Sequence, residues 1–224
     1  MGLFNDFFGT SNSSNAEFSL ETLLSLVTNS ISRFDKIRRE LEKIIFFDRI
    51  VSFEIPIEYQ KEAVEFEQEY KDRYIISTGI ISLAIVEYLV NKRSKNIKNV
   101  DTLNQLKWKC FSNILVVRKK IILRNLQPEL QQGYSFFYDN ELEIIDNSGN
   151  KNRFSLLITN ISEEIKGLIE QNSNINHTRN YFGVRMGQIF AENLPERNEE
   201  VGDLIKTQIK ITCKELEKYF FNQL

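Results

Sequence analysis

The sequence contains a single histidine, His177, among its 224 residues, and this scarcity removes several kinds of active site. Zinc motifs that need two histidines on one helix cannot be built, and a nucleophile–histidine relay has one base available. The phosphate-cradling patterns GxxxxGK[ST] and GxGxxG do not occur either. We therefore expect a protein that is not an enzyme, with no catalytic residues, no metal and no cofactor.

Proline and glycine are also scarce, at three and nine residues, which favours long helices over a fold with many turns. The two cysteines, Cys110 and Cys213, lie far apart and form no CxxC pair, so we expect reduced, buried thiols in a cytoplasmic protein. The chain begins without a basic segment, which predicts no secretory signal. Abundant asparagine and lysine are typical of AT-rich bacterial genomes, and we expect a bacterial origin.

The most apolar stretch covers residues 74–90, YIISTGIISLAIVEYLV. A helical wheel places apolar residues on all its sides, apart from Glu87 and small polar residues, so other elements must cover it all round. Its length is at the lower limit for a membrane-spanning helix, and Glu87 would lie within the bilayer. We interpret the stretch as a buried core helix and regard a membrane span as unlikely.

Helical periodicity and end signals predict helices at residues 19–48, 57–92, 101–126, 160–171, 178–193 and 199–221. Apolar residues of the first helix recur as in a coiled coil: Leu20, Leu24, Val27, Ile31, Phe34, Leu41 and Ile45. The third helix leaves one polar strip for solvent: Gln105, Lys109, Asn113, Lys120 and Arg124. Gly79, in the middle of the second helix, marks either a close helix crossing or a bend.

The periodicity changes after Gly133. Residues 134–138 and 141–145 have the pattern of two strands joined by the turn Asp139–Asn140, and residues 153–159 that of a third strand. The predicted fold class is therefore mainly α, a long-helix bundle with a small β-hairpin or meander insert. Its parts are a flexible tail at residues 1–16, the bundle at residues 17–132, and a smaller α+β part at residues 133–224, with the meander at residues 134–159.

Charge is unevenly distributed along a chain whose formal net charge is only −2. Residues 92–124 hold ten bases and one acid, residues 54–72 hold seven acids and two bases, and residues 129–146 hold five acids and no base. Antiparallel packing of the second helix on the third would face the first acidic block to the basic block, with Asp72 beside Lys119. The bases without an opposite charge would form a basic tip at the turn: Lys92, Arg93, Lys95, Lys98, Lys107 and Lys109.

The layout is compatible with three functions. The leading interpretation is a non-enzymatic helical scaffold or adaptor that assembles with a protein partner or with itself, as a homo-oligomer. The first alternative is a nucleic-acid-binding accessory protein that holds phosphates with Lys92, Arg93, Lys95, Lys98, Lys109, Lys120 and Arg124. The second alternative is an enzyme with a site near His177, where Arg179 and Arg185 could bind an anion.

The N-terminal tail carries four large apolar residues ahead of the polar linker at residues 10–15: Leu3, Phe4, Phe7 and Phe8. These residues predict either a frayed terminus or a tether that docks in a groove of a partner protein or on a membrane surface.

Overall fold

The computed structural model describes residues 20–41, 57–93, 100–126, 128–145, 148–170 and 198–221. These residues form α1 (Leu20–Phe34), α3 (Ile57–Arg93), α4 (Val100–Asn125), α5 (Pro128–Ile145), α6 (Ser148–Glu170) and α8 (Asn198–Phe221). No strand occurs within these ranges, and the prediction of a mainly α fold is confirmed. The bounds of α3, α4 and α8 agree with the predicted helices to within one residue.

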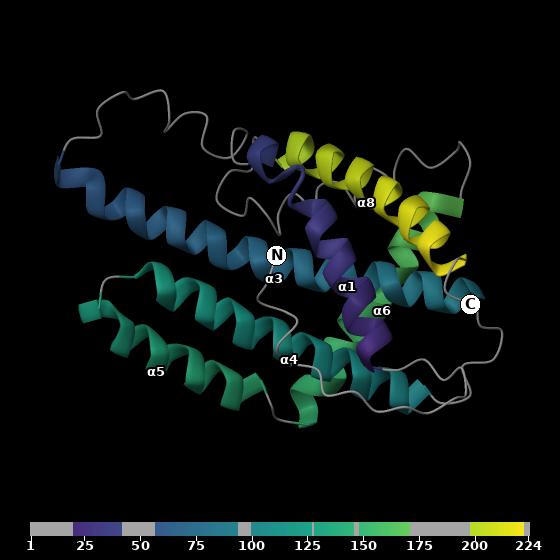
Figure 1. Ribbon diagram of the computed structural model, residues 1–224, viewed down its shortest axis with the longest axis horizontal. Helices are drawn as coiled ribbons and strands as arrows, with labels where there is room; N and C mark the ends of the chain where they lie inside the picture. Colours follow the sequence, from purple (N-terminus) through teal and green to yellow (C-terminus); the bar gives the residue numbers. More distant parts are fainter. Residues whose placement is uncertain are drawn as a thin grey trace.

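Helix α3 is the element on which most of the others pack. Its 37 residues give it a length of about 55 Å, and it contacts α1, α4, α6 and α8. In the view of Figure 1, α4 and α8 lie on opposite sides of α3 while α1 crosses over it. The apolar residues of α3 from Tyr74 to Val90 are buried or half-buried on every side of the helix, because these neighbours surround that half.

Within the described residues, Tyr74–Lys92 is the one helical segment long and apolar enough to cross a membrane. Other parts of the chain bury 78% of its most apolar window. That burial agrees with a core helix, since a spanning helix in contact with lipid leaves much of its apolar surface uncovered by protein.

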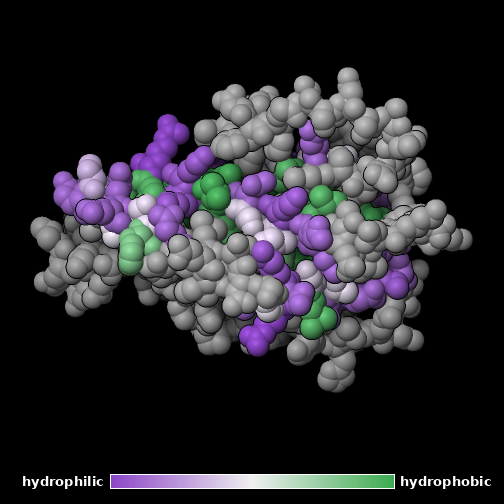
Figure 2. Space-filling model, turned by 90° about the horizontal axis from the view of Figure 1, so that it is seen from below, coloured by the Kyte–Doolittle hydropathy of each residue, from purple (hydrophilic) through white to green (hydrophobic). Residues whose placement is uncertain are grey.

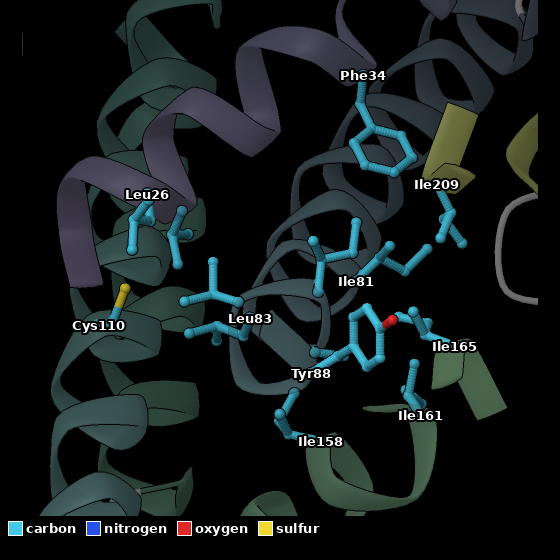
Figure 3. Packing of buried hydrophobic residues seen from close by; sticks show 14 of the residues in the cluster. Leu26, Phe34, Ile81, Leu83, Tyr88, Cys110, Ile158, Ile161, Ile165 and Ile209 are labelled. Carbon is cyan, nitrogen blue, oxygen red and sulfur yellow. The ribbon is translucent and has the colours of Figure 1, made fainter. Parts of the chain in front are cut away.

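The core is one cluster of buried side chains that joins α1, α3, α4, α6 and α8. Figure 3 shows residues of α3 surrounded by residues of its neighbours. The labelled members are Leu26 and Phe34 of α1, Ile81, Leu83 and Tyr88 of α3, Cys110 of α4, Ile158, Ile161 and Ile165 of α6, and Ile209 of α8. None of the described side chains of α5 belongs to the cluster.

The predicted β-meander at residues 134–159, and with it the α+β second part, is wrong. Residues 134–145 belong to α5, and residues 153–159 lie inside α6. Pro128 begins α5 and Glu129 stands in its first turn, where a fixed φ and a negative charge both favour a helix start. The inward face of α6 recurs every three or four residues across the predicted strand–helix boundary: Phe154, Ile158, Ile161, Ile165 and Leu168.

The predicted first helix is interrupted. Helix α1 ends at Phe34, residues 35–37 form a turn, and residues 38–41 are helical again. In the turn the backbone N–H groups of Ile37 and Arg38 donate to carbonyls three residues back. Phe34 and Leu41, on either side of the turn, are both fully buried, so the core holds the chain at both ends of the break. Residues 42–48 lie outside the described ranges.

Gly79 marks a close crossing of α3 and α4. A Cβ atom built on Gly79 would lie 3.1 Å from both Cδ1 and Cγ2 of Ile114. This distance is shorter than an ordinary carbon–carbon contact, so the missing side chain allows the two helices to approach.

The crossing predicts an energetic coupling between Gly79 and Ile114. Gly79→Ala gains about 1 kcal/mol of helix propensity but meets the Ile114 side chain, which Ile114→Ala removes. We expect Gly79→Ala to be more favourable by about 1 kcal/mol in the Ile114→Ala background than in the wild type. Denaturant unfolding of the four proteins measures this coupling, and strictly additive effects would contradict the close crossing.

Candidate functional site

The predicted polar strip of α4 lies on the surface. Gln105, Lys109, Asn113, Lys120 and Arg124 are all exposed, as predicted. Val116 occupies the step between Asn113 and Lys120 and is exposed as well. The strip therefore presents three cations along about 22 Å of helix, broken by one apolar residue.

Other bases of α4 are not surface charges. Lys107 and Arg118 are each 1% exposed, so the expectation that Lys107 belongs to a basic tip is wrong. Lys119 is half-buried, and its Nζ lies 2.5 Å from Oδ1 of Asp139 on α5. Sequence reasoning missed this pair because it assigned Asp139 to a hairpin turn.

Lys92, the first residue of the predicted tip, is attached to α8. Its Nζ lies 2.9 Å from Oε1 of Glu217 and 5.9 Å from the centre of the Tyr88 ring. The hydrogen bond to Glu217 raises the pKa of the Lys92 ammonium, and partial burial opposes the shift. Arg93 is the last residue of α3. The remaining candidates lie outside the described residues: Lys95, Lys98, Leu3, Phe4, Phe7, Phe8, His177, Arg179 and Arg185.

Helices α4 and α5 form a hairpin, and we call α5 with the facing part of α4, residues 113–126, the α4–α5 arm (Figure 1). Helix α5 packs chiefly against α4, and the Lys119–Asp139 pair sets the register between them. Exposed residues follow each other at helical spacing along the outer face of α5: Glu129, Gln132, Gly133, Phe136 and Asp139. Figure 2, which views the molecule from the side of α5, shows small hydrophobic patches separated by hydrophilic residues.

Phe136 is the most exposed large hydrophobic residue of the described chain, at 70%. The Lys119–Asp139 register places it close to the level of Ile122 and Ile121 on α4. Ile121 is also exposed, although it continues the apolar face that Cys110 and Ile114 bury in the core. The apolar face of α4 thus extends beyond the helices that cover it.

The first half of α4, which precedes the arm, is fixed by a polar network inside the core. Lys107 Nζ donates to Oε2 of Glu87 at 2.8 Å, and the Thr159 hydroxyl donates to Oε1 of the same carboxylate at 2.9 Å. Lys107 Nζ also lies 3.5 Å from Thr159 Oγ1. The network connects α3, α4 and α6, and Glu87 is 5% exposed. Both carboxylate oxygens are engaged by protein groups, so the network acts as a structural connection.

An aromatic cluster adjoins this network. The rings of Phe111 on α4 and Phe154 on α6 stack with centroids 4.2 Å apart, and Trp108 meets Phe154 edge-on at 5.6 Å. Lys151 lies over the Trp108 ring at 5.6 Å. These contacts hold α6 against the same half of α4 that carries Lys107.

Within the described ranges, no group of three or more histidine, cysteine or acidic residues is placed to hold a metal ion. Comparisons with known protein families, with curated proteins and with solved structures found no match to this chain.

The buried network predicts that one substitution within it lowers the unfolding free energy far more than replacing all three of its residues together. Lys107→Met leaves the Glu87 carboxylate buried without its cation, and we expect a loss of about 3–5 kcal/mol in unfolding free energy. Combining it with Glu87→Leu and Thr159→Val removes the uncompensated charge and should recover most of that loss. Lys109→Met, on the exposed strip two residues away, is the matched control and should change stability by less than about 0.5 kcal/mol. Equal effects of the two lysine substitutions in denaturant unfolding would refute the network's role.

The buried thiols predict a pH dependence. Burial raises the pKa of both Cys110 and Cys213 from 9.0 to about 12. Between these values the unfolded chain loses thiol protons that the native chain keeps, so stability should be retained below pH 9 and fall as pH rises toward 12. At pH 8 we expect iodoacetamide to modify neither thiol in the native protein and both in denaturant, as read by intact-mass spectrometry. Rapid alkylation of a native thiol would show that it is not buried.

Proposed function

We propose that this protein is a non-enzymatic helical scaffold or adaptor that binds a protein partner through the α4–α5 arm. The observation that carries the proposal is the outer face of α5. This helix packs chiefly on α4 and contributes no described side chain to the core, and it presents Phe136 to solvent.

A single exposed phenylalanine is ordinary on a protein surface, so the residues around it determine whether the surface can bind a partner. Phe136 lies between Glu129 and Asp139 on α5, and the exposed apolar residues Val116 and Ile121 lie on the adjoining helix. Exposed aromatic, aliphatic and charged residues together have the composition of a protein–protein contact, in which aromatic anchors supply most of the binding energy.

The arm also has a rigid base. Gly79 brings α3 within contact of α4, and the buried network fixes Lys107 between α3 and α6. Since α4 is continuous from Lys107 to Arg124, its exposed strip is held in a fixed orientation by the buried side of the same helix. A preorganised surface loses little conformational entropy when a partner binds.

A nucleic-acid-binding accessory role is the second candidate, favoured by the exposed cations Lys109, Lys120 and Arg124. A phosphate backbone along this strip would meet exposed Val116 and would pass beside an acidic α5 that contains no base. For this reason the nucleic-acid role ranks below a protein partner. The enzymatic alternative near His177 remains a prediction about residues outside the described ranges.

The proposal predicts that capture of a partner depends on Phe136. The tagged protein, Phe136→Asp and Leu156→Asp are used to capture proteins from native lysate after nuclease treatment, at two salt concentrations, with quantitative mass spectrometry. Leu156 is the matched control, because it is 61% exposed but lies on α6. We expect a stoichiometric partner with the wild type and Leu156→Asp, and its loss with Phe136→Asp.

Two results would change the conclusion. If the three proteins capture the same partners in equal amounts, the arm is not the binding surface. If nucleic acid co-purifies before nuclease treatment and is lost at high salt and in Lys120→Glu/Arg124→Glu, the second candidate replaces the first.

A further inference from the structure

We infer that the partner of the α4–α5 arm is a second copy of this chain, so that two arms pair with the basic strip of each α4 facing the acidic outer face of the other α5. This inference rests on the proposed use of the arm as a binding surface. It goes further by naming the occupant and the relative placement of the helices.

Charge is separated between the two helices of the arm. Helix α4 contains six bases and a single acid, Asp101, whereas α5 contains four acids and no base. On the described surface of the arm, α4 exposes Lys120 and Arg124, and α5 exposes Glu129 together with Asp139, whose carboxylate also pairs with Lys119 of the same chain. One arm therefore carries both members of a complementary pair of surfaces.

Symmetry favours the same pairing. Most homo-oligomers close about a two-fold axis, which requires a self-complementary surface and uses every contact twice. Pairing α4 with α4, or α5 with α5, would place like charges together. A two-fold pairing of α4 with α5 of the other copy places opposite charges together on both sides of the axis, so the charge pattern selects this arrangement.

The apolar residues of the arm fit the same arrangement. In this pairing Phe136 of each copy approaches the α4 strip of the other, where Val116 is exposed. Aromatic and aliphatic side chains would then occupy the middle of the contact, while Arg124 and Glu129 occupy the tip. Within the described part of the chain the structure gives neither of these two residues an ion pair.

The size of the arm indicates the strength of the association. Helix α5 has 18 residues and is about 27 Å long, and two adjacent helices present a face about 20 Å wide. This face corresponds to roughly 500 Å² per copy, or about 1,000 Å² in total, at the lower limit for a specific interface. We therefore expect a reversible dimer in the micromolar range that weakens with salt.

Sedimentation equilibrium of the purified full chain from about 1 to 100 µM, at low and high salt, tests the inference. The acidic variant carries Lys120→Glu and Arg124→Glu, and the basic variant carries Glu129→Lys and Gln132→Lys. Each variant alone has like charges on both helices, and its self-dissociation constant should rise about tenfold or more. An equimolar mixture restores opposite charges at both contacts and should form heterodimers as tight as the wild-type dimer.

The Phe136→Asp variant, which keeps the wild-type charges on α4, should be monomeric. The Leu156→Asp variant should dimerise as the wild type does. Circular dichroism checks that each variant keeps its helical content. A wild-type chain that stays monomeric up to about 100 µM, or a mixture of folded variants that does not reassociate, would overturn the inference.

The outcome is distinguishable from failure of the proposed function. A monomeric chain that still captures a different protein in a Phe136-dependent way removes the second copy as occupant and retains the arm as a binding surface. Dimers that are insensitive to both the charge variants and Phe136→Asp would place the contact elsewhere and overturn the inference.

Discussion

The carboxylate of Glu87 lies inside the most apolar helix of the chain, and the arrangement of the surrounding helices depends on how that charge is satisfied. Lys107 supplies the counter-charge from α4 and Thr159 supplies a hydroxyl from α6, so α3, α4 and α6 meet at one point. Removing one member of such a group costs far more than replacing the whole group, because the desolvated charge remains. The network therefore selects one arrangement of three helices more strongly than apolar contacts, which tolerate sliding, would do alone.

The Glu87–Lys107 contact also shows that α3 and α4 pair in a different register from the predicted one. The pairs Gly79–Ile114 and Glu87–Lys107 have residue numbers that add to 193 and 194, whereas the predicted pair Asp72–Lys119 adds to 191. The observed pairing is therefore shifted by two or three residues from the predicted one, and with this shift a different side of α4 faces α3. Lys107 thereby enters the core, and Lys119 turns to Asp139 of α5. Charge blocks in the sequence indicated that α3 and α4 pair, but only side-chain packing determines which charges meet.

Helices with one continuous periodic pattern were predictable from the sequence, and those with competing local signals were not. For α3, α4 and α8, apolar spacing and end signals agree, and the exposed strip of α4 was identified residue by residue. In α5 the aromatic run that begins at Tyr134 favours a strand locally, yet packing against α4 requires helical spacing. The spacing from Phe154 to Leu168 crosses the predicted start at Asn160, a signal that a longer window would have detected. The surface proposed for binding was not predicted from the sequence, because the register of the arm and the exposure of Phe136 depend on tertiary contacts.

Helix α4 connects the interior of the molecule to the surface proposed for binding. Its first half is enclosed, with Cys110 in the core, Lys107 in the polar network and Trp108 against Phe154 of α6. Its second half still buries Arg118 and Ile122, but the apolar face that Ile114 buries in the core becomes exposed at Ile121. A continuous helix transmits orientation over this distance, since bending it would break backbone hydrogen bonds. The position of the arm is therefore determined by the core, and a substitution at Lys107 that loosens α4 would also displace the proposed binding surface, although Lys107 lies outside it.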